Sequence, residues 1–447
     1  MKPKRRADRL AAILFFLSYS ALIAGGALVY GIFAGMKHWA PVPQLDAIYE
    51  QVKELLPSAN DFLIVDRIKH DTTIETLDAA ALAPGLVLVA GDYEPRQTFV
   101  RIMERDGTIV HEWRIPWGDI WASGEGEFPT GRRPASNMYL HGFDMLPDGS
   151  IVSNFEHLST FRMDVCGKVL WKHDNLGHHS VHYDGRNSVW VSAEDYFDKN
   201  PVGIPNHDAP FRSWTLQEIS LEGEILRSIP VIEIILQNNL DGLLYGSNLE
   251  NARVRVSGDT LHLNDVESFP FDMEPGFFEP GDLAISLRNN HTVMVLDSET
   301  LKVKLVSTGE VLRQHDIDFL DGNTVSIFDN RHPPQKFPER GSQIVEIDGP
   351  TGDVRVALSG RLGGEGEPFF THVMGAHERL SNGNIIIAES DAGRILEFTP
   401  DGKLVWRYSN RWEKDETKNL RVFGVKLLPP EMDADFFKEK KALCENS

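Results

Sequence analysis

The stretch QHDIDFLDGNTVSIFDN, residues 314–330, contains the pattern around which this chain is built. His315 stands near its start, and the first apolar segment ends at Leu320. An Asp-Gly-Asn turn at 321–323 then leads into a second apolar run at 324–328. An Asp-Gly pair between two apolar runs is a strong short-range signal for a β-hairpin. We therefore expect a hairpin here, with a histidine at the beginning of its first strand.

Related stretches recur along the chain, most of them with a histidine at the start, a Gly-containing turn and a second apolar run. The six units begin at Gly85, His141, His179, His262, His315 and His377. Four short antiparallel strands repeated radially make a β-propeller, which leaves only short, protected edges. The sequence therefore predicts an all-β fold in which residues 85–430 form a six-bladed β-propeller.

Two irregularities of the repeat need an explanation. The first unit lacks an inner strand of its own, and the apolar run 422–428 follows the sixth unit. We expect this run to return to the first unit and close the ring. The step from His179 to His262 carries an insertion around Pro230 to Asn251, with a partly helical pattern.

The N-terminus carries five basic residues before an uncharged run, 10–36, that is rich in Leu, Ile, Ala and Phe. A membrane-spanning helix needs about 20 such residues, whereas the core of a signal peptide has about 7–15. We therefore expect an uncleaved transmembrane signal anchor at 10–36, with residues 1–9 as a cytoplasmic tail. In a bacterium this predicts a single-pass protein of the inner membrane whose main domain lies in the periplasm. A cleaved signal peptide is the alternative.

The segments on either side of the propeller are expected to connect and extend it. Residues 37–84 are expected to form a stalk and linker, and apolar residues at helical spacing between Leu45 and Leu56 predict a short stalk helix. Residues 431–447 are expected to be a C-terminal tail.

Composition and charge exclude some classes of partner. The 447 residues are 41% apolar and 25% charged, so the chain can bury a sizeable core. The formal net charge of −21 argues against nucleic acid as a partner. Cys166 and Cys444 are the only cysteines, without a CxxC pair, so neither a structural zinc site nor a disulfide scaffold is expected. These two residues would be able to pair in an oxidising compartment, but we favour one buried thiol and one loose thiol in the tail.

The innermost strand of each propeller blade begins at the central channel, so the histidines that open the units would converge on one axis. A purely structural role, in which each imidazole bonds its own turn, explains His141 and His377 equally well. Charged and amide side chains accompany His179, His262 and His315, which favours a functional role for these three.

Candidate groups for chemistry stand beside these histidines. His262 and Asn264 are two residues apart on an expected strand, so they would share a face. Arg288 ends a β run, and its planar fork of donors suits an oxyanion. A neutral imidazole such as His315 can act as a nucleophile. Asp316 would be able to orient His315, but we expect its side chain on the opposite face of the strand. The set predicts an anion pocket that contains a nucleophile.

Several of these segments together resemble the bacterial arylsulfotransferases (aryl-sulfate sulfotransferases). They are HLND at 262–265, GDLAISLRNNHTVMVLD at 281–297, the opening stretch at 314–330, and GAHERLSNGNIIIAES with GRILEFTPDGKLVWRY at 375–408. The resemblance covers about residues 85–409. It implies a six-bladed propeller of the bacterial periplasm that moves a sulfuryl group from an aryl sulfate ester to a phenolic acceptor, without a nucleotide sulfate donor.

The resemblance also implies roles for single residues. His315 matches the histidine that is transiently sulfurylated, so the mechanism would be ping-pong. His262, Asn264 and Arg288 match the residues that hold the sulfuryl oxygens and help proton transfer to the leaving phenolate.

A further histidine on an earlier blade is harder to match. His179, within HHSVH, corresponds to the family's histidine, but Ser180 stands where the family has an aspartate. His178 and His182 are therefore close competitors. The chain also lacks the closely spaced cysteine pair that members of the family often have.

Two other functions remain open at this stage. The chain would also suit a non-catalytic periplasmic propeller that binds a ligand or scaffolds an envelope complex, because the fold alone does not decide function. A hydrolase of aryl sulfates, with water as the acceptor, is the third. The expected partners are the donor ester, the phenolic acceptor and the membrane, with a homodimer also open; no cofactor and no dedicated metal site are expected.

Overall fold

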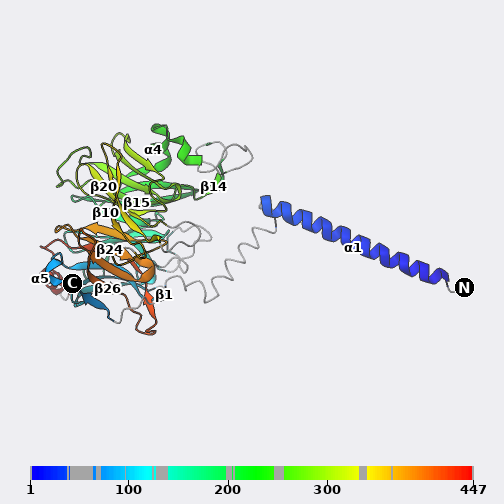
Figure 1. Ribbon diagram of the computed structural model, residues 1–447. Coiled ribbons are helices and arrows are strands. Elements are labelled where there is room, and N and C mark those ends of the chain that lie inside the picture. Colours follow the sequence, from blue (N-terminus) through cyan, green and yellow to red (C-terminus); the bar gives the residue numbers. More distant parts are fainter. Residues whose placement is uncertain are drawn as a thin grey trace. The chain divides into compact units, whose positions relative to one another are not determined.

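The computed structural model describes residues 3–37, 40, 64–66, 72–95, 97–122, 125–126, 139–197, 204, 207–245, 256–331, 340–363 and 366–444. The chain divides into two compact units, residues 1–59 and residues 60–447. Figure 1 shows the long helix of the first unit and the strands of the second. The expected stalk helix between Leu45 and Leu56 lies outside the described residues.

The first unit contains helix α1 (Pro3–Lys37). Within it, Ile13–Gly35 is long and apolar enough to cross a membrane. Such a helix serves either as a single-pass anchor or as a signal sequence. The expected apolar N-terminal helix is therefore confirmed.

The second unit is a six-bladed propeller of antiparallel sheets. Its inner strands, those next to the channel, are β28 (Val422–Leu427), β6 (Leu140–Met145), β10 (His178–Tyr183), β15 (Leu263–Ser268), β19 (His315–Phe319) and β23 (Ala376–Arg379). The second strands are β3 (Val87–Glu94), β7 (Ile151–Phe155), β11 (Ser188–Phe197), β16 (Asp282–Leu287), β20 (Thr324–Asp329) and β24 (Ile385–Glu389). The prediction of an all-β, six-bladed propeller is thus confirmed.

The outer half of each blade follows the same order. The third strands are β4 (Gln97–Met103), β8 (Ser159–Met163), β12 (His207–Ser220), β17 (Thr292–Asp297), β21 (Gln343–Asp348) and β25 (Arg394–Phe398). The fourth strands are β5 (Ile109–Ile115), β9 (Val169–His173), β13 (Ile225–Pro230), β18 (Val303–Thr308), β22 (Val354–Ser359) and β26 (Leu404–Ser409). Four short strands lie outside this scheme: β14 (Val256–Gly258) pairs with β12, β2 (Ile74–Thr76) pairs with β26, and β1 (Ile64–Asp66) forms a separate two-stranded sheet with β27 (Lys418–Leu420).

Helices are few among the described residues of the propeller unit. They are α3 (Trp117–Ile120), α4 (Val231–Gln237), α5 (Ala434–Cys444) and the 3₁₀ turns η2 (Ala79–Ala81), η4 (Asp241–Tyr245), η5 (Arg288–Asn290) and η7 (Ser390–Ala392). Helix α4 confirms the partly helical insertion between the third and fourth units.

The ring closes as the sequence suggested. Strand β28 pairs antiparallel with β3, with Val425 opposite Val89. The chain's last strand is therefore the inner strand of its first blade, which is the predicted return of residues 422–428.

The core lies between neighbouring blades. Alternating apolar side chains of each sheet face the next sheet, as with Trp214 and Leu216 of β12 against Ile285 and Met294 of β16 and β17. Each of these four side chains is fully buried. Packing of this kind fixes the angle between blades and so the position of every inner strand.

The cysteine prediction was wrong. Cys166, in the turn between β8 and β9, and Cys444, at the end of α5, form a disulfide with their Cα atoms 5.5 Å apart. Phe437 is fully buried in the core of the first two blades and so holds α5 against the propeller. The expectation of a loose tail overlooked the two adjacent phenylalanines of α5, Phe436 and Phe437.

Candidate active site

The start of the inner strands determines which side chains reach the channel. Five of the six, β6, β10, β15, β19 and β28, carry a break in register close to their first residue. Such β-bulges interrupt the alternation of side chains between the two faces of a strand. His179, His262 and Asp316 take the left-handed backbone conformation there, with φ of 53°, 55° and 54°. Neighbouring residues such as His178 and His179 can therefore face the same space.

Five imidazoles meet at this level of the channel, and all are buried: His141, His178, His179, His262 and His315. The Nε2 atom of His262 lies 3.1 Å from Nε2 of His178 and 3.0 Å from Nε2 of His179. The ring centroids of His179 and His315 are 5.2 Å apart, and those of His141 and His179 are 3.6 Å apart. The structure thus brings together imidazoles from four blades.

The tautomer of His315 follows from its neighbour Asn330. The Nδ2 group of Asn330 donates to the carbonyl oxygens of Thr371 (3.0 Å) and Met374 (2.7 Å), so its Oδ1 atom is left as an acceptor. That oxygen lies 2.7 Å from Nδ1 of His315, which must therefore donate. The Nε2 atom then carries the lone pair, and it has no partner among the described residues. Burial, and next the positive charge of Arg288, hold the pKa of His315 well below its usual value, so the ring is neutral near pH 7.

His262 is oriented by a carboxylate. Its Nδ1 atom contacts Oδ2 of Asp259, whose other oxygen accepts from Nε1 of Trp214 at 2.9 Å. Although burial opposes ionisation, the His262 hydrogen bond keeps the pKa of Asp259 below its ordinary value. Burial and then Arg288 lower the pKa of His262 to about 4. Neutral His262 therefore donates from Nδ1 and accepts at Nε2.

Glu156 performs the same task for His141 and also lies beside His178, whose Nδ1 makes no hydrogen bond among the described residues. Its carboxylate contacts Nδ1 of His141 and lies 3.1 Å from Nδ1 of His178. Burial acts to raise the pKa of Glu156, but the surrounding imidazoles of His141, His178 and His157 hold it well below its usual value. An ionised carboxylate therefore lies behind this part of the cluster.

Arg288 supplies the permanent charge of the site. It follows β16 directly, and its backbone N–H donates to the carbonyl of His262 at 3.0 Å. Burial and then Arg313 lower the pKa of Arg288 to about 10, so the guanidinium stays charged at neutral pH. Asn264 is fixed differently, because its Nδ2 donates to the carbonyl of Gln314 at 2.6 Å and its Oδ1 finds no partner among the described residues.

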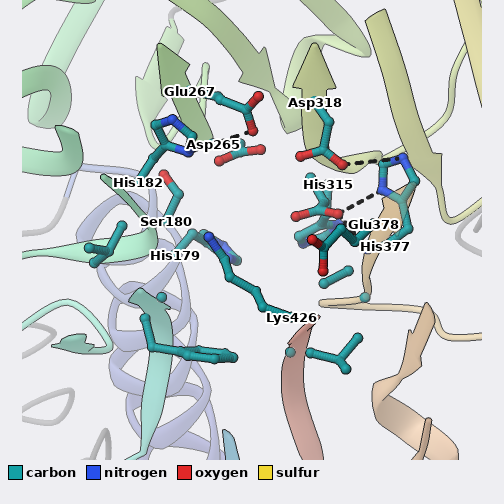
Figure 2. A pocket seen from close by; sticks show the side chains of 18 of the residues that line it. His179, Ser180, His182, Asp265, Glu267, His315, Asp318, His377, Glu378 and Lys426 are labelled. Atoms are coloured by element: carbon teal, nitrogen blue, oxygen red, sulfur yellow. Dashed lines mark hydrogen bonds and ion pairs between the residues drawn. The ribbon is translucent and has the colours of Figure 1, made fainter. Parts of the chain in front are cut away.

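A cavity of about 370 Å³ adjoins the imidazoles. His141, His179, Asn264 and His315 line one part of it, whereas Arg288 and His262 are not among its lining residues. Figure 2 shows His179 and His315 beside the carboxyl groups that line the rest. Those carboxyl groups belong to Asp265, Glu267, Asp316, Asp318 and Glu378. We call them the acidic layer, and the five imidazoles the histidine layer.

Burial disfavours ionisation of four carboxyl groups in the acidic layer. Burial is the main cause that raises the pKa of Asp265, Glu267 and Asp318, and the neighbouring carboxyl groups add to it. Burial likewise raises the pKa of Glu378 to about 7. These groups are therefore partly protonated near neutral pH when the cavity holds no cation.

The predicted site residues can now be located. His315, His262 and His179 meet in the histidine layer. His178 also contacts His262 there, whereas His182 lies 3.7 Å from Glu267 in the acidic part of the cavity. His377 pairs with Asp316 at 2.7 Å.

The expectation that Asp316 faces away from His315 was wrong. Both side chains line the cavity, because the bulge between His315 and Ile317 breaks the alternation. Asp316 consequently orients His377, while Asn330 orients His315.

Sequence reasoning missed Glu156, Asn330 and Asp259. A signal for the first two was present in the repeat. Glu156 and Asn330 each stand one residue beyond the second strand of their blade, and Arg288 stands at the same position of the fourth blade. Aligning the units on their second strands would have placed all three at one level of the channel.

Two described groups have donor atoms close enough for a metal ion. They are His141, Glu156, His178 and His179 in the histidine layer, and Asp316, Asp318 and His377 in the acidic layer. In the first group Glu156 contacts Nδ1 of His141, and in the second Asp316 pairs with His377.

Comparison with known proteins adds one strong match. Residues 142–411 match the family described as arylsulfotransferase (ASST). No curated protein matches the chain. A protein of unknown function from Bacteroides caccae is 13% identical over 73% of this chain and 94% of its own, with a TM-score of 0.41. A streptogramin B lyase is 12% identical over 79% of this chain and 97% of its own, with a TM-score of 0.39. Likenesses of this size carry no inference about function.

Proposed function

The chain belongs to the arylsulfotransferase family, and from this premise we propose that it moves a sulfuryl group from an aryl sulfate ester to a phenolic acceptor through a sulfohistidine on His315. The mechanism is ping-pong and needs no nucleotide sulfate donor. The observation that carries the proposal is the Nε2 atom of His315, which is buried, neutral and unpartnered among the described residues while Asn330 holds the opposite nitrogen.

The two half-reactions balance on this nitrogen. In the first, the Nε2 lone pair forms a bond to sulfur, and the bond between sulfur and the aryl oxygen breaks and leaves its electron pair on the phenolate. In the second, the oxygen of the acceptor phenol bonds to sulfur, and the N–S bond returns its electron pair to His315. The phenol's proton passes to a neutral imidazole of the histidine layer and then to solvent. Splitting the transfer in this way replaces one difficult step by two easier ones.

Electrostatics favour the same assignment. The transferred group spreads negative charge over its non-bridging oxygens, and fixed cationic donors stabilise that charge. Arg288 is the charged group that lowers the pKa of both His315 and His262, so its field reaches both rings. We assign it, with His262 and His179, to the sulfuryl oxygens and the leaving phenolate. The free Oδ1 of Asn264 is an acceptor, which suits the hydroxyl group of the acceptor phenol rather than a sulfuryl oxygen.

The disulfide and α1 support a location outside the cytoplasm. Disulfides persist in oxidising compartments such as the periplasm. We propose that α1 anchors the protein in the inner membrane, with residues 1–9 in the cytoplasm, residues 10–36 spanning, residues 37–84 as a linker, and the propeller at 85–430 and tail at 431–447 in the periplasm.

The test uses the full-length protein in detergent with para-nitrophenyl sulfate. Without an acceptor we expect one burst of nitrophenolate per enzyme, and with phenol we expect continuous turnover. His315→Ala should abolish both, whereas His173→Ala, on an outer strand, should retain both. Mass spectrometry should find one sulfuryl group on a peptide that contains His315. Continuous release without phenol would favour a hydrolase, and no release with any aryl sulfate would favour the binding protein.

A further inference from the structure

The acidic layer brings more carboxyl groups to one cavity than there are permanent cations among its lining residues. Two permanent cations, Lys426 and Arg379, line the cavity with the five carboxyl groups. Lys426 lies 3.0 Å from Asp144, and Arg379 bonds Glu346, and neither of these two acids lines the cavity. The direct ion pairs of both cations are therefore with carboxylates outside the cavity, although the charge of Lys426 also opposes the rise in the pKa of Glu267 and Glu378.

The two histidines in this part of the cavity, His182 and His377, do not supply positive charge for the remaining carboxyl groups. Burial lowers the pKa of His182 to about 4, so its ring is neutral. His377 is already engaged with Asp316 and lies 3.5 Å from Asp318. Among the described residues, Asp265, Glu267 and Glu378 therefore form no direct ion pair with a lysine or arginine, and each accepts a backbone N–H instead.

Two further polar atoms indicate that the cavity takes a ligand. Nε2 of His315 and Oδ1 of Asn264 belong to side chains that are 3% exposed, and both residues line the cavity. Neither atom has a partner among the described residues. A nucleophilic nitrogen and a hydrogen-bond acceptor therefore lie at one part of the cavity, and unmatched carboxyl groups lie at another (Figure 2).

The size and the remaining walls favour an organic molecule. Sites for small molecules have volumes of about 300–1,000 Å³, and this cavity of about 370 Å³ falls within that range. Phe143, Phe319 and Phe423 add aromatic surface to it. A second cavity of about 550 Å³ shares Glu378 and Lys426 with the first, and its other lining residues include the acids Asp144 and Glu431 and an apolar wall that contains Leu427 and Phe436.

We propose that this cavity binds the sulfuryl acceptor and selects phenols that carry a protonated amine over phenols that carry a carboxylate. The phenolic hydroxyl donates to Oδ1 of Asn264, beside the sulfurylated nitrogen of His315, and the ammonium group lies among Asp265, Glu267 and Glu378. This inference rests on the proposed sulfotransferase function. It extends that function by giving the donor and the acceptor different binding determinants. The anionic donor ester is repelled by the acidic layer and attracted by Arg288.

The test compares three acceptors of similar size with para-nitrophenyl sulfate as the donor: tyramine, para-ethylphenol and para-hydroxyphenylacetate. Rates are normalised to the burst of nitrophenolate, which counts the active enzyme. We expect kcat/KM for tyramine to exceed that for para-hydroxyphenylacetate by at least about tenfold, because several carboxyl groups act on the opposite charges. The value for para-ethylphenol should lie between them.

Two isosteric variants test whether the carboxyl groups of the acidic layer cause the preference for the amine. Glu378→Gln and Glu267→Gln should each lower the ratio of kcat/KM for tyramine to that for para-hydroxyphenylacetate several-fold. Glu222→Gln removes the same charge from an exposed turn between β12 and β13 and should leave the ratio unchanged.

The outcomes separate the two proposals. Absence of any nitrophenolate burst would contradict the sulfotransferase itself. A normal burst with equal use of the three acceptors would overturn the selectivity alone. A preference for tyramine that disappears with EDTA would assign the acidic layer to a metal ion and overturn the proposal as well.

Discussion

The histidine layer and the acidic layer lie on the same inner strands but differ in how their ionisable side chains are paired. Each of three imidazoles in the first layer has a fixed partner behind it: Asn330 for His315, Asp259 for His262 and Glu156 for His141. In the second layer the carboxyl groups face one another across the cavity with few cations between them. A partner behind a ring fixes its tautomer and leaves its front nitrogen for chemistry. Carboxyl groups without such partners can instead bind a positively charged group of a ligand.

The largest effect on activity is expected when the hydrogen bond that orients one imidazole of the histidine layer is reversed. Asp259→Asn would place an amide donor against Nδ1 of His262, because the amide oxygen is needed by Nε1 of Trp214. His262 would then carry its proton on Nε2 and face His178 and His179 with the wrong polarity. We expect kcat/KM to fall by at least about 100-fold, as for other reversed tautomers.

Its control is Asp297→Asn, which makes the same change in the outer hairpin of the same blade. Both variants should fold, as measured by circular dichroism and thermal melting. A loss of less than threefold in Asp259→Asn would mean that the orientation of His262 does not matter.

A second prediction separates the layers by stability rather than by chemistry. The disulfide holds α5, and Phe436 of α5 lines the second cavity beside Glu378. Cys444→Ser should lower the free energy of unfolding by about 2–4 kcal/mol, as is typical for loss of a disulfide that closes a long loop. It should also lower kcat/KM for acceptors more than it lowers the nitrophenolate burst rate.

Denaturant unfolding and the two kinetic readouts test this prediction. The double variant Cys166→Ser/Cys444→Ser should match the single one, because each removes the same bond. Equal losses in the burst rate and in kcat/KM for the acceptors would contradict a link between α5 and the acceptor side.

The smallest effect concerns the pH dependence of stability. The folded protein raises the pKa of Glu378 to about 7, so between the unfolded value and 7 it binds more protons than the unfolded chain does. Stability from this group is therefore present at low pH and lost as pH rises through 7. Histidines with lowered pKa values, such as His262 at about 4, have the opposite sign, and stability from them is lost as pH falls from about 6.5.

Glu378→Gln should consequently stabilise the protein at pH 8 relative to pH 5. Since the Glu378 side chain is only half-buried, we expect a difference on the order of 1 kcal/mol in the free energy of unfolding. The exposed Glu222→Gln should show no such dependence. An equal effect of Glu378→Gln at both pH values would contradict a raised pKa in the folded state.

Sequence periodicity was sufficient for the ring and for the convergence of His179, His262 and His315. Hairpin turns and a repeated opening histidine are local signals, and a propeller is the architecture that places such repeats around one axis. The same reasoning failed for Asp316, because it assumed strict alternation along β19. The left-handed residue that creates the bulge is an aspartate, which gives no obvious sign in the sequence.

The side chains that orient the imidazoles were not predicted from the sequence for another reason. Asp259 lies between β14 and β15, and Glu156 stands after an ordinary apolar strand, so neither belongs to a recognisable motif. Their importance comes from the radial packing of blades, which single-strand patterns do not contain. The Cys166–Cys444 pair is a similar case, since 278 residues separate the two cysteines in sequence.

The pairing of β28 with β3 has a consequence for how the molecule is made. A ribosome makes residues 87–94 before the other five blades and residues 422–427 after them, yet these two segments lie side by side in one sheet. A nascent or prematurely terminated chain carries every residue of the histidine layer but leaves an open wedge in the channel wall, without Lys426 and the apolar wall beside it. The imidazoles of the histidine layer are therefore enclosed only after residues 422–427 have been made, and the disulfide through Cys444 forms later still.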